Sequence, residues 1–212
     1  MFDAVSFDKE VNNLIREGQR DKAEERLLRA RSELKLAGSI EDLEYVVSRL
    51  ARFYSTPGAE NLEKAEAYFL ESEVLLPGAG TKYQTAMFYY YVVQDSQKTV
   101  GKVDEIRPPQ VVADRGSYYS ALTLKGQALI DLERQDHTGE ILQALLDLIK
   151  ANPAGLPYGD EVNLLQAAIS NPILMPRCRE ILHLIIPKIR SQEYVEKAKA
   201  LLKSISPGYE LS

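Results

Sequence analysis

Residues 21–30 read DKAEERLLRA, and residues 63–72 read EKAEAYFLES. The two stretches share a set of aligned residues: Lys22 with Lys64, Ala23 with Ala65, Glu24 with Glu66, and Leu28 with Leu70. In each stretch a bulky residue stands between two small ones, which are Ala23, Leu27 and Ala30 in the first and Ala65, Phe69 and Ser72 in the second. Spacings of four and three place these residues on one face of a helix. Small side chains let a second helix approach closely, and the bulky one fills the space beside them.

The repetition predicts stacked helical units, because one such unit cannot bury its apolar face alone. Apolar residues recur at helical spacing along the chain, and no sustained two-residue alternation indicates strands. The pattern therefore predicts an all-α protein of about ten helices. Two of these helices are separated near Gly18, a third begins after Ser39, and the others are expected at about 61–76, 81–97, 113–132, 139–151, 160–170, 175–190 and 192–205.

The helices group into two sets. Residues 1–97 are expected to form N-terminal hairpins, 98–111 an irregular connector, and 112–212 C-terminal hairpins, together making one continuous solenoid. Pro108 and Pro109 are the reason for the connector, because adjacent prolines forbid a continuous helix. Pro176 fits the first turn of its helix, and Pro187 predicts a kink or an end.

These residues resemble the tetratricopeptide repeat family. Gly18, Ala23, Leu27 and Ala30 look like the turn and second helix of one repeat. The second unit is a fuller match. Leu50, Ala51 and Tyr54 look like the apolar positions of the family's first helix, and Gly58 looks like its turn glycine. Ala65, Phe69, Ser72 and Pro77 look like the packing alanine, the aromatic residue, the small residue and the terminal proline. Weaker copies contain Gly126, Leu145, Leu148, Asn152 and Pro153, and then Glu196–Ala198, Leu202 and Pro207.

The resemblance implies a right-handed superhelical stack of antiparallel helical hairpins whose first helices line a concave groove. It covers about residues 10–77 well and residues 114–153 and 174–207 in part, whereas residues 80–112 match poorly. The quoted stretches are 42 residues apart (63 − 21), whereas the family repeat is about 34 residues long. The chain is therefore similar to a degenerate member of the family.

The net charge of −5 argues against nucleic acid as the main partner, because polyanion binding depends on Lys and Arg. Residues 177–212 nevertheless carry seven Lys or Arg against four Asp or Glu, so binding of nucleic acid through these basic helices stays an alternative. The single cysteine, Cys178, cannot form an internal disulfide. Residues 1–11 lack the basic start and apolar stretch of a signal peptide, and no segment is apolar enough to cross a membrane. We expect a cytoplasmic protein.

Few residues suggest catalysis. His137 and His183 have no metal-binding spacing, and Cys178 is expected to be a buried structural thiol. The stretch PGAGTK at residues 77–82 lacks the full phosphate-binding pattern and follows a helix. The sequence therefore predicts no enzyme activity, no cofactor and no metal.

Tyrosines mark the candidate binding site. Tyr89, Tyr90 and Tyr91 are consecutive, so one helix cannot bury all three rings on a narrow stripe, and at least one is expected to be partly exposed. Tyrosine suits recognition because it combines an apolar face, a hydroxyl and few rotatable bonds. The predicted partner-binding residues are Tyr54, Tyr83, Met87, Tyr90, Tyr91, Arg49 and Arg52. The alternatives are that the rings pack between hairpins and that the arginines are ordinary surface charges.

The sequence thus favours a non-catalytic protein–protein interaction module, such as an adaptor, a chaperone-like protein or a regulatory subunit, that binds a peptide or protein surface. A small inhibitor or immunity protein that neutralises a basic toxin or enzyme fits the acidic charge of the first 176 residues equally well. The sequence leaves a homo-oligomer open.

Overall fold

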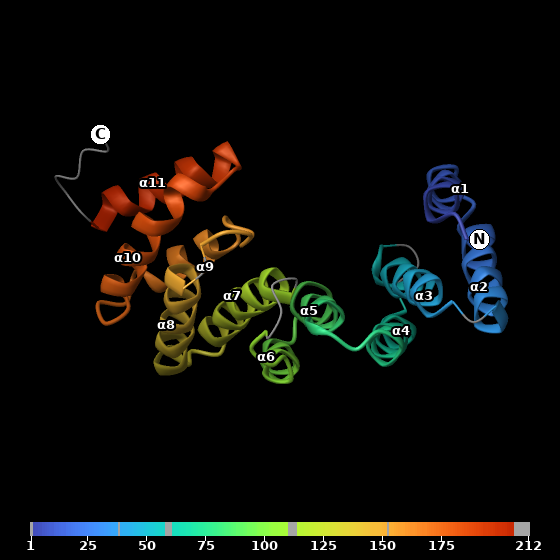
Figure 1. Cartoon of the computed structure of the whole chain (residues 1–212), viewed down its shortest axis with the longest axis horizontal. Coiled ribbons are helices and arrows are strands. Elements are labelled where there is room, and N and C mark those ends of the chain that lie inside the picture. Colours follow the sequence, from blue (N-terminus) through green and yellow to red (C-terminus); the bar gives the residue numbers. More distant parts are fainter. Residues whose placement is uncertain (1, 38, 58–60, 110–113, 152, 206–212) are drawn as a thin grey trace. The chain divides into compact units, whose positions relative to one another are not determined.

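The computed structural model describes residues 2–37, 39–57, 61–109, 114–151 and 153–205. The chain divides into two compact units, Met1–Val93 and Gln94–Ser212 (Figure 1). In the described ranges the regular elements are all helical, with eleven α-helices and no strand, which confirms the predicted all-α class. The repeat positions Gly58, Asn152 and Pro207 lie outside these ranges, as does the end of the expected connector, residues 110–111.

The first unit is a series of helices, each packed against the next: α1 (Ala4–Arg16), α2 (Arg20–Ala37), α3 (Ile40–Ser55), α4 (Leu62–Leu75), α5 (Ala79–Met87) and η1 (Phe88–Val93). The predicted break at Gly18 is confirmed, because this residue has a φ of +74°, a left-handed conformation that glycine adopts at little cost. Side chains cap three of these helices, as expected for their residue types. Asp3 accepts from the Val5 and Ser6 N–H groups, Ser39 from the Asp42 N–H, and Asn61 from the Lys64 N–H.

The repeated stretches have the packing role that the sequence predicted. Ala23 and Ala65 are both fully buried, and Ala30 and Ser72 are each 2% exposed. The glutamates of the two stretches also have equivalent partners. The Tyr54 hydroxyl on α3 donates to Glu24 on α2, and the Tyr89 hydroxyl on η1 donates to Glu66 on α4 at 2.8 Å. In both places a glutamate of the repeated motif binds a tyrosine of the helix that follows.

The single helix expected at residues 81–97 is wrong in its second half. After Met87 the chain continues as a π-helix, η1, and stops at Gln94, which has a φ of +58°. A π turn holds more residues than an α turn, so it changes which side chains face the core. Val93 packs against the core, while Val92 and Tyr91 are 36% and 62% exposed. The prediction of a partly exposed tyrosine in this run is confirmed.

The first helix of the second unit, α6, extends into the segment that was expected to be irregular. Its elements are α6 (Ser96–Asp104), α7 (Arg115–Asp131), α8 (Gln135–Ala151), α9 (Glu161–Ala168), α10 (Met175–Ile185), η3 (Ile186–Lys188) and α11 (Gln192–Ile205). The expectation of an irregular chain is therefore wrong for residues 98–104. Helix α6 forms there because Asp95 caps it, accepting from the Lys98 N–H at 2.8 Å, and because Val100 and Val103 are buried.

In the second unit, some helices contact more than their neighbours in the chain. Helix α7 packs against α6, α8 and α9, and α10 packs against α8, α9 and α11. Pro176 lies in the first turn of α10, as predicted, and Pro187 lies in the short 3-10 turn that ends this helix. Across the part of the chain that the structure describes, no helix has the length and apolar character needed to cross a membrane.

Candidate partner-binding groove

The first unit contains an open groove of about 430 Å³ between the C-terminal end of α3 and the α5–η1 segment, with one residue of α4 in its wall. The described residues that line it come from these three places: Arg52, Ser55 and Thr56; Phe69; and Gln84, Met87, Phe88, Tyr91 and Val92. Most of this lining is apolar or aromatic. Such a surface offers room for a side chain of another molecule.

Two features shape the apolar part of the groove. Phe69 and Phe88 pack against each other with ring centroids 5.0 Å apart, and both rings are almost fully buried. The π-helix then places Tyr91 and Val92, which follow Phe88, at the open side with much of their surface exposed. The result is an aromatic wall with an accessible edge.

Three of the seven predicted binding residues line this groove: Met87, Tyr91 and Arg52. Tyr90 is half-buried and is not among the lining residues, but its ring packs edge-on against Tyr91, with centroids 5.0 Å apart and planes at 86°. It is placed to hold the Tyr91 ring. Tyr83, also half-buried on α5, does not line the groove.

Tyr54 belongs to a different part of the unit. It is only 3% exposed, its hydroxyl donates to Glu24, and its ring stacks on Tyr68 with the planes 5° apart. Lys64 lies over the same ring, 4.7 Å from its centroid. Burial raises the pKa of the Tyr54 phenol above its usual range, and the hydrogen bond from Tyr54 lowers the pKa of the Glu24 carboxyl. A side chain held in this way fastens α3 to its neighbours and cannot form part of the groove.

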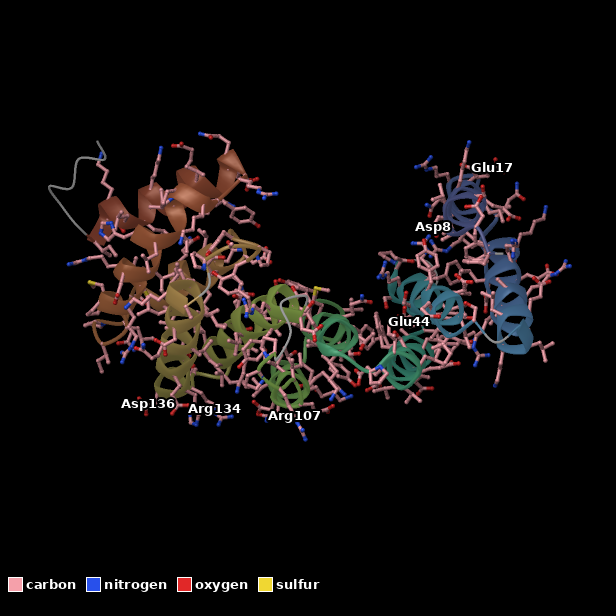
Figure 2. The ribbon with its side chains drawn as sticks, in the orientation of Figure 1. Asp8, Glu17, Glu44, Arg107, Arg134 and Asp136 are labelled. Atoms are coloured by element: carbon pink, nitrogen blue, oxygen red, sulfur yellow. The ribbon has the colours of Figure 1, made fainter. Side chains whose placement is uncertain are left out.

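Arg49 is also committed within the fold. Its Nε lies 3.0 Å from Oδ1 of Asp8, which Figure 2 labels on α1, and a terminal nitrogen donates to the side chain of Asn12. Both acceptors are on α1, so Arg49 joins α1 to α3. The sequence could not separate Arg49 from Arg52, because both are arginines on the same predicted helix.

Replacing Arg49 by Gln should lower the free energy of unfolding by about 1 kcal/mol, because Asp8 then loses its ion-pair partner in a half-buried place. Urea unfolding followed by circular dichroism measures the change. Arg29→Gln is the control, since Arg29 is exposed and its ion pair is with Glu33, one turn away on the same helix. Equal stabilities of the two variants would contradict the role assigned to Arg49.

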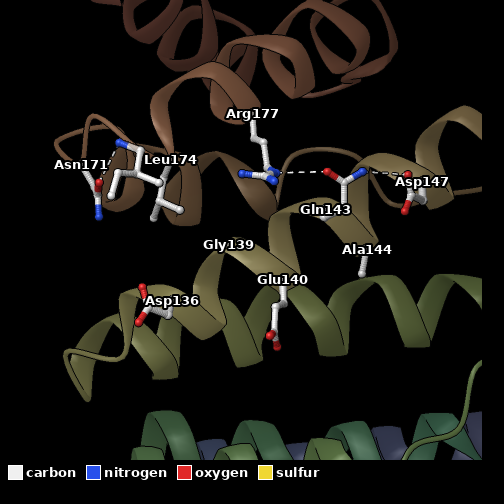
Figure 3. Close-up of a pocket in the computed structure, with 10 residues that line it drawn as sticks. Asp136, Gly139, Glu140, Gln143, Ala144, Asp147, Asn171, Leu174 and Arg177 are labelled. Atoms are coloured by element: carbon white, nitrogen blue, oxygen red, sulfur yellow. Dashed lines mark hydrogen bonds between the residues drawn. The ribbon is translucent and has the colours of Figure 1, made fainter.

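The second unit has a pocket of about 580 Å³ beside α8, the α9–α10 link and the start of α10 (Figure 3). Arg177 Nε donates to Oε1 of Gln143 at 3.1 Å, and the Gln143 amide donates to Asp147 at 2.9 Å. Asp136 and Glu140 add two further carboxylates to the lining. Because its polar groups partly satisfy one another and its charges have both signs, this pocket defines a ligand class less clearly than the groove does.

The basic C-terminal helices carry charges that are partly paired. Lys197 lies 2.8 Å from Glu193, and Lys199 lies 3.7 Å from Glu196, all on α11. Arg179 donates to the backbone carbonyl of Ile205. These contacts reduce the positive potential that α11 and its surroundings present to a polyanion.

The described residues contain no group of three or more His, Cys, Asp or Glu that is arranged to hold a metal ion. Cys178 is buried, and this burial raises the pKa of its thiol to about 11, where the reactive thiolate is scarce at neutral pH.

The sequence analysis did not single out Glu161, whose carboxyl is completely buried at the start of α9. One oxygen accepts from the Gly159 N–H at 2.9 Å, and the side chain is next to Tyr119 of α7 and Asp160. Burial raises the pKa of this carboxyl to about 7. In the sequence it looked like an ordinary acidic residue in a first helical turn.

Comparison with known proteins adds no assignment: no protein-family model, no curated protein and no solved structure matches this chain.

Proposed function

We propose that this chain is a tetratricopeptide-like helical repeat protein that acts as a non-catalytic interaction module and binds a segment of another protein in the groove of its first unit. The observation that carries the proposal is the exposure of Tyr91 and Val92 beside the Phe69–Phe88 pair in an open groove of about 430 Å³. A large exposed aromatic side chain beside an apolar wall is typical of residues that contribute most to protein–protein binding.

The repeat architecture is supported by two further observations. The Glu24–Tyr54 and Glu66–Tyr89 hydrogen bonds join equivalent positions of the two motif copies to the following helix. In the second unit, α7 contacts α9 and α8 contacts α10, as alternate helices do in a stack of hairpins. We propose on this basis a right-handed solenoid of antiparallel hairpins.

The proposal includes a cytoplasmic location, which rests on the sequence features alone. An adaptor, a chaperone-like protein and a regulatory subunit would all use such a groove in the same physical way. A rigid surface that is formed before binding loses little conformational entropy on association.

The Tyr91→Ala variant tests the proposal. Immobilised wild-type protein should retain a specific protein from a lysate of the source organism, and Tyr91→Ala should retain about tenfold less of it, because the exposed ring supplies much of the apolar contact. Val74→Ala is the control, since Val74 is 80% exposed on α4 and does not line the groove. Equal retention by Tyr91→Ala and wild type, with unchanged circular dichroism, would contradict the assignment of the groove.

A further inference from the structure

The groove contains a single charge among its described lining residues, the guanidinium of Arg52. Arg52 is exposed, and a terminal nitrogen donates to Oε1 of Gln84 across the groove at 3.2 Å. Among the described residues no carboxylate pairs with Arg52, whereas Arg26, Arg31 and Arg49 of the same unit each have an ion-pair partner. The groove therefore presents an uncompensated positive charge.

The hydroxyl groups of Ser55 and Thr56 at this end of the groove are already occupied. The Ser55 hydroxyl donates to the Ala51 carbonyl at 2.7 Å, and the Thr56 hydroxyl donates to the Phe53 carbonyl at 2.8 Å. Arg20 also donates to the Thr56 hydroxyl, at 2.9 Å. Arg52 is consequently the donor best placed to select a polar group of an occupant.

The apolar surface lies on the same groove wall as the Gln84 contact. Gln84, Met87 and Tyr91 are spaced at three and four residues along α5 and η1, so they follow one another along one side of this segment. An occupant that covers Met87 and Tyr91 thus reaches the Gln84 end, where Arg52 is. The spacing favours an apolar side chain and a charged side chain of one short segment.

We propose that the occupant is an acidic–apolar segment of a partner protein, in which a bulky apolar side chain lies against Phe88 and Tyr91 and a nearby Asp or Glu side chain pairs with Arg52. This inference rests on the function proposed above and specifies its partner. Charge complementarity carries it, because a guanidinium held at one edge of a carboxylate-free groove favours a carboxylate with two acceptor oxygens.

Met87 provides the measurement, because the chain has three methionines and, of the two that the structure describes, Met87 lines the groove and Met175 does not. The full chain is labelled with methyl-¹³C methionine, and the Met87 signal is assigned with a Met175→Leu variant and a Met87→Leu variant. The probes are N-acetylated, C-amidated nonapeptides with a central Phe in a Gly-Ser background. Each peptide has one variable residue within three positions of the Phe. This residue is Glu, Gln or Lys, and the three peptides of a set differ at that position alone.

The expected result is that at least one Glu peptide shifts the Met87 methyl signal and binds about fivefold more tightly than its Gln counterpart, with Lys peptides weaker still. Arg52→Gln should remove this preference, and Arg52→Glu should reverse it in favour of Lys. Arg29→Gln removes one positive charge, as Arg52→Gln does, but from an exposed residue outside the groove. This variant should keep the preference for Glu.

Equal binding of Glu and Gln peptides would overturn the acidic partner while leaving the proposed groove function intact. Tighter binding of a peptide that has a free C-terminal carboxylate and no Glu would also overturn it, in favour of a chain terminus as the occupant. If no peptide moves the Met87 signal but Tyr91→Ala still loses a partner from lysate, the acidic–apolar segment is wrong and the interaction module stands. If Tyr91→Ala also retains the partner, the groove itself is wrong.

Discussion

Replacing Glu161 by Gln raises the free energy of unfolding at pH 8 by about 3 kcal/mol. Burial raises the pKa of the Glu161 carboxyl from an ordinary value near 4.5 to about 7, and this shift corresponds to that cost of burying the ionised carboxylate. The groups around it do not compensate the charge. They are Tyr119 of α7, Tyr158 and Asp160 of the preceding link, and the N–H groups of Gly159 and Glu161 itself. Glutamine keeps the acceptor for the Gly159 N–H and removes the charge.

The pH dependence follows from the direction of the shift. The folded state holds the proton more tightly than the unfolded state, so the protonated carboxyl leaves the fold fully stable below about pH 4.5. Stability is then lost as the pH rises to about 7 and stays level above it. The difference in unfolding free energy between Glu161→Gln and wild type should therefore grow from pH 5 to pH 7 and be constant from pH 7 to pH 8.

Urea unfolding at unit steps between pH 5 and pH 8 measures this difference. Glu140→Gln is the matched control, because Glu140 is exposed on α8 and its replacement should give a difference that does not change with pH. Parallel profiles for wild type and Glu161→Gln across the whole range would show that the buried carboxyl has no raised pKa.

Replacing Ala65 by Leu lowers the free energy of unfolding by about 2 kcal/mol, because three added carbons overpack the contact between α3 and α4. Ala65 is completely buried on α4, which packs against α3, whose Leu50 and Ala51 are also fully buried. Ala23→Leu should have a similar cost, since Ala23 holds the equivalent place on α2 and is equally buried.

The control for this prediction is on the same helix. Ala67 is exposed, and alanine and leucine have similar helix propensities, so Ala67→Leu should change stability by less than about 0.5 kcal/mol. Urea unfolding of the three variants beside wild type gives the comparison. If Ala65→Leu were as stable as Ala67→Leu, the small residue of the motif would have no role in close helix packing.

The sequence by itself determined the features that depend on residues close together in the chain. Helical spacing, the helix start after Ser39 and the break at Gly18 are all local, and the structure confirms them. The small positions Ala23 and Ala65 could also be recognised, because a repeated pattern shows which face of a helix is buried even when its partner is unknown. The sequence also predicts that at least one of Tyr89, Tyr90 and Tyr91 is partly exposed, since three consecutive rings cannot share one stripe, and the exposed residue is Tyr91.

Only the tertiary structure decided which side chains meet across the fold. Arg49 and Arg52 are equivalent in the sequence, and Asp8 of α1 makes one a structural contact while the other faces the groove. Tyr54 was expected at the binding site, yet Glu24 and Tyr68 hold it in the interior. The burial of Glu161 has the same origin. In each case the packing of distant helices fixes the environment of a side chain, and that environment, rather than the local pattern, sets its exposure, its charge and its partners.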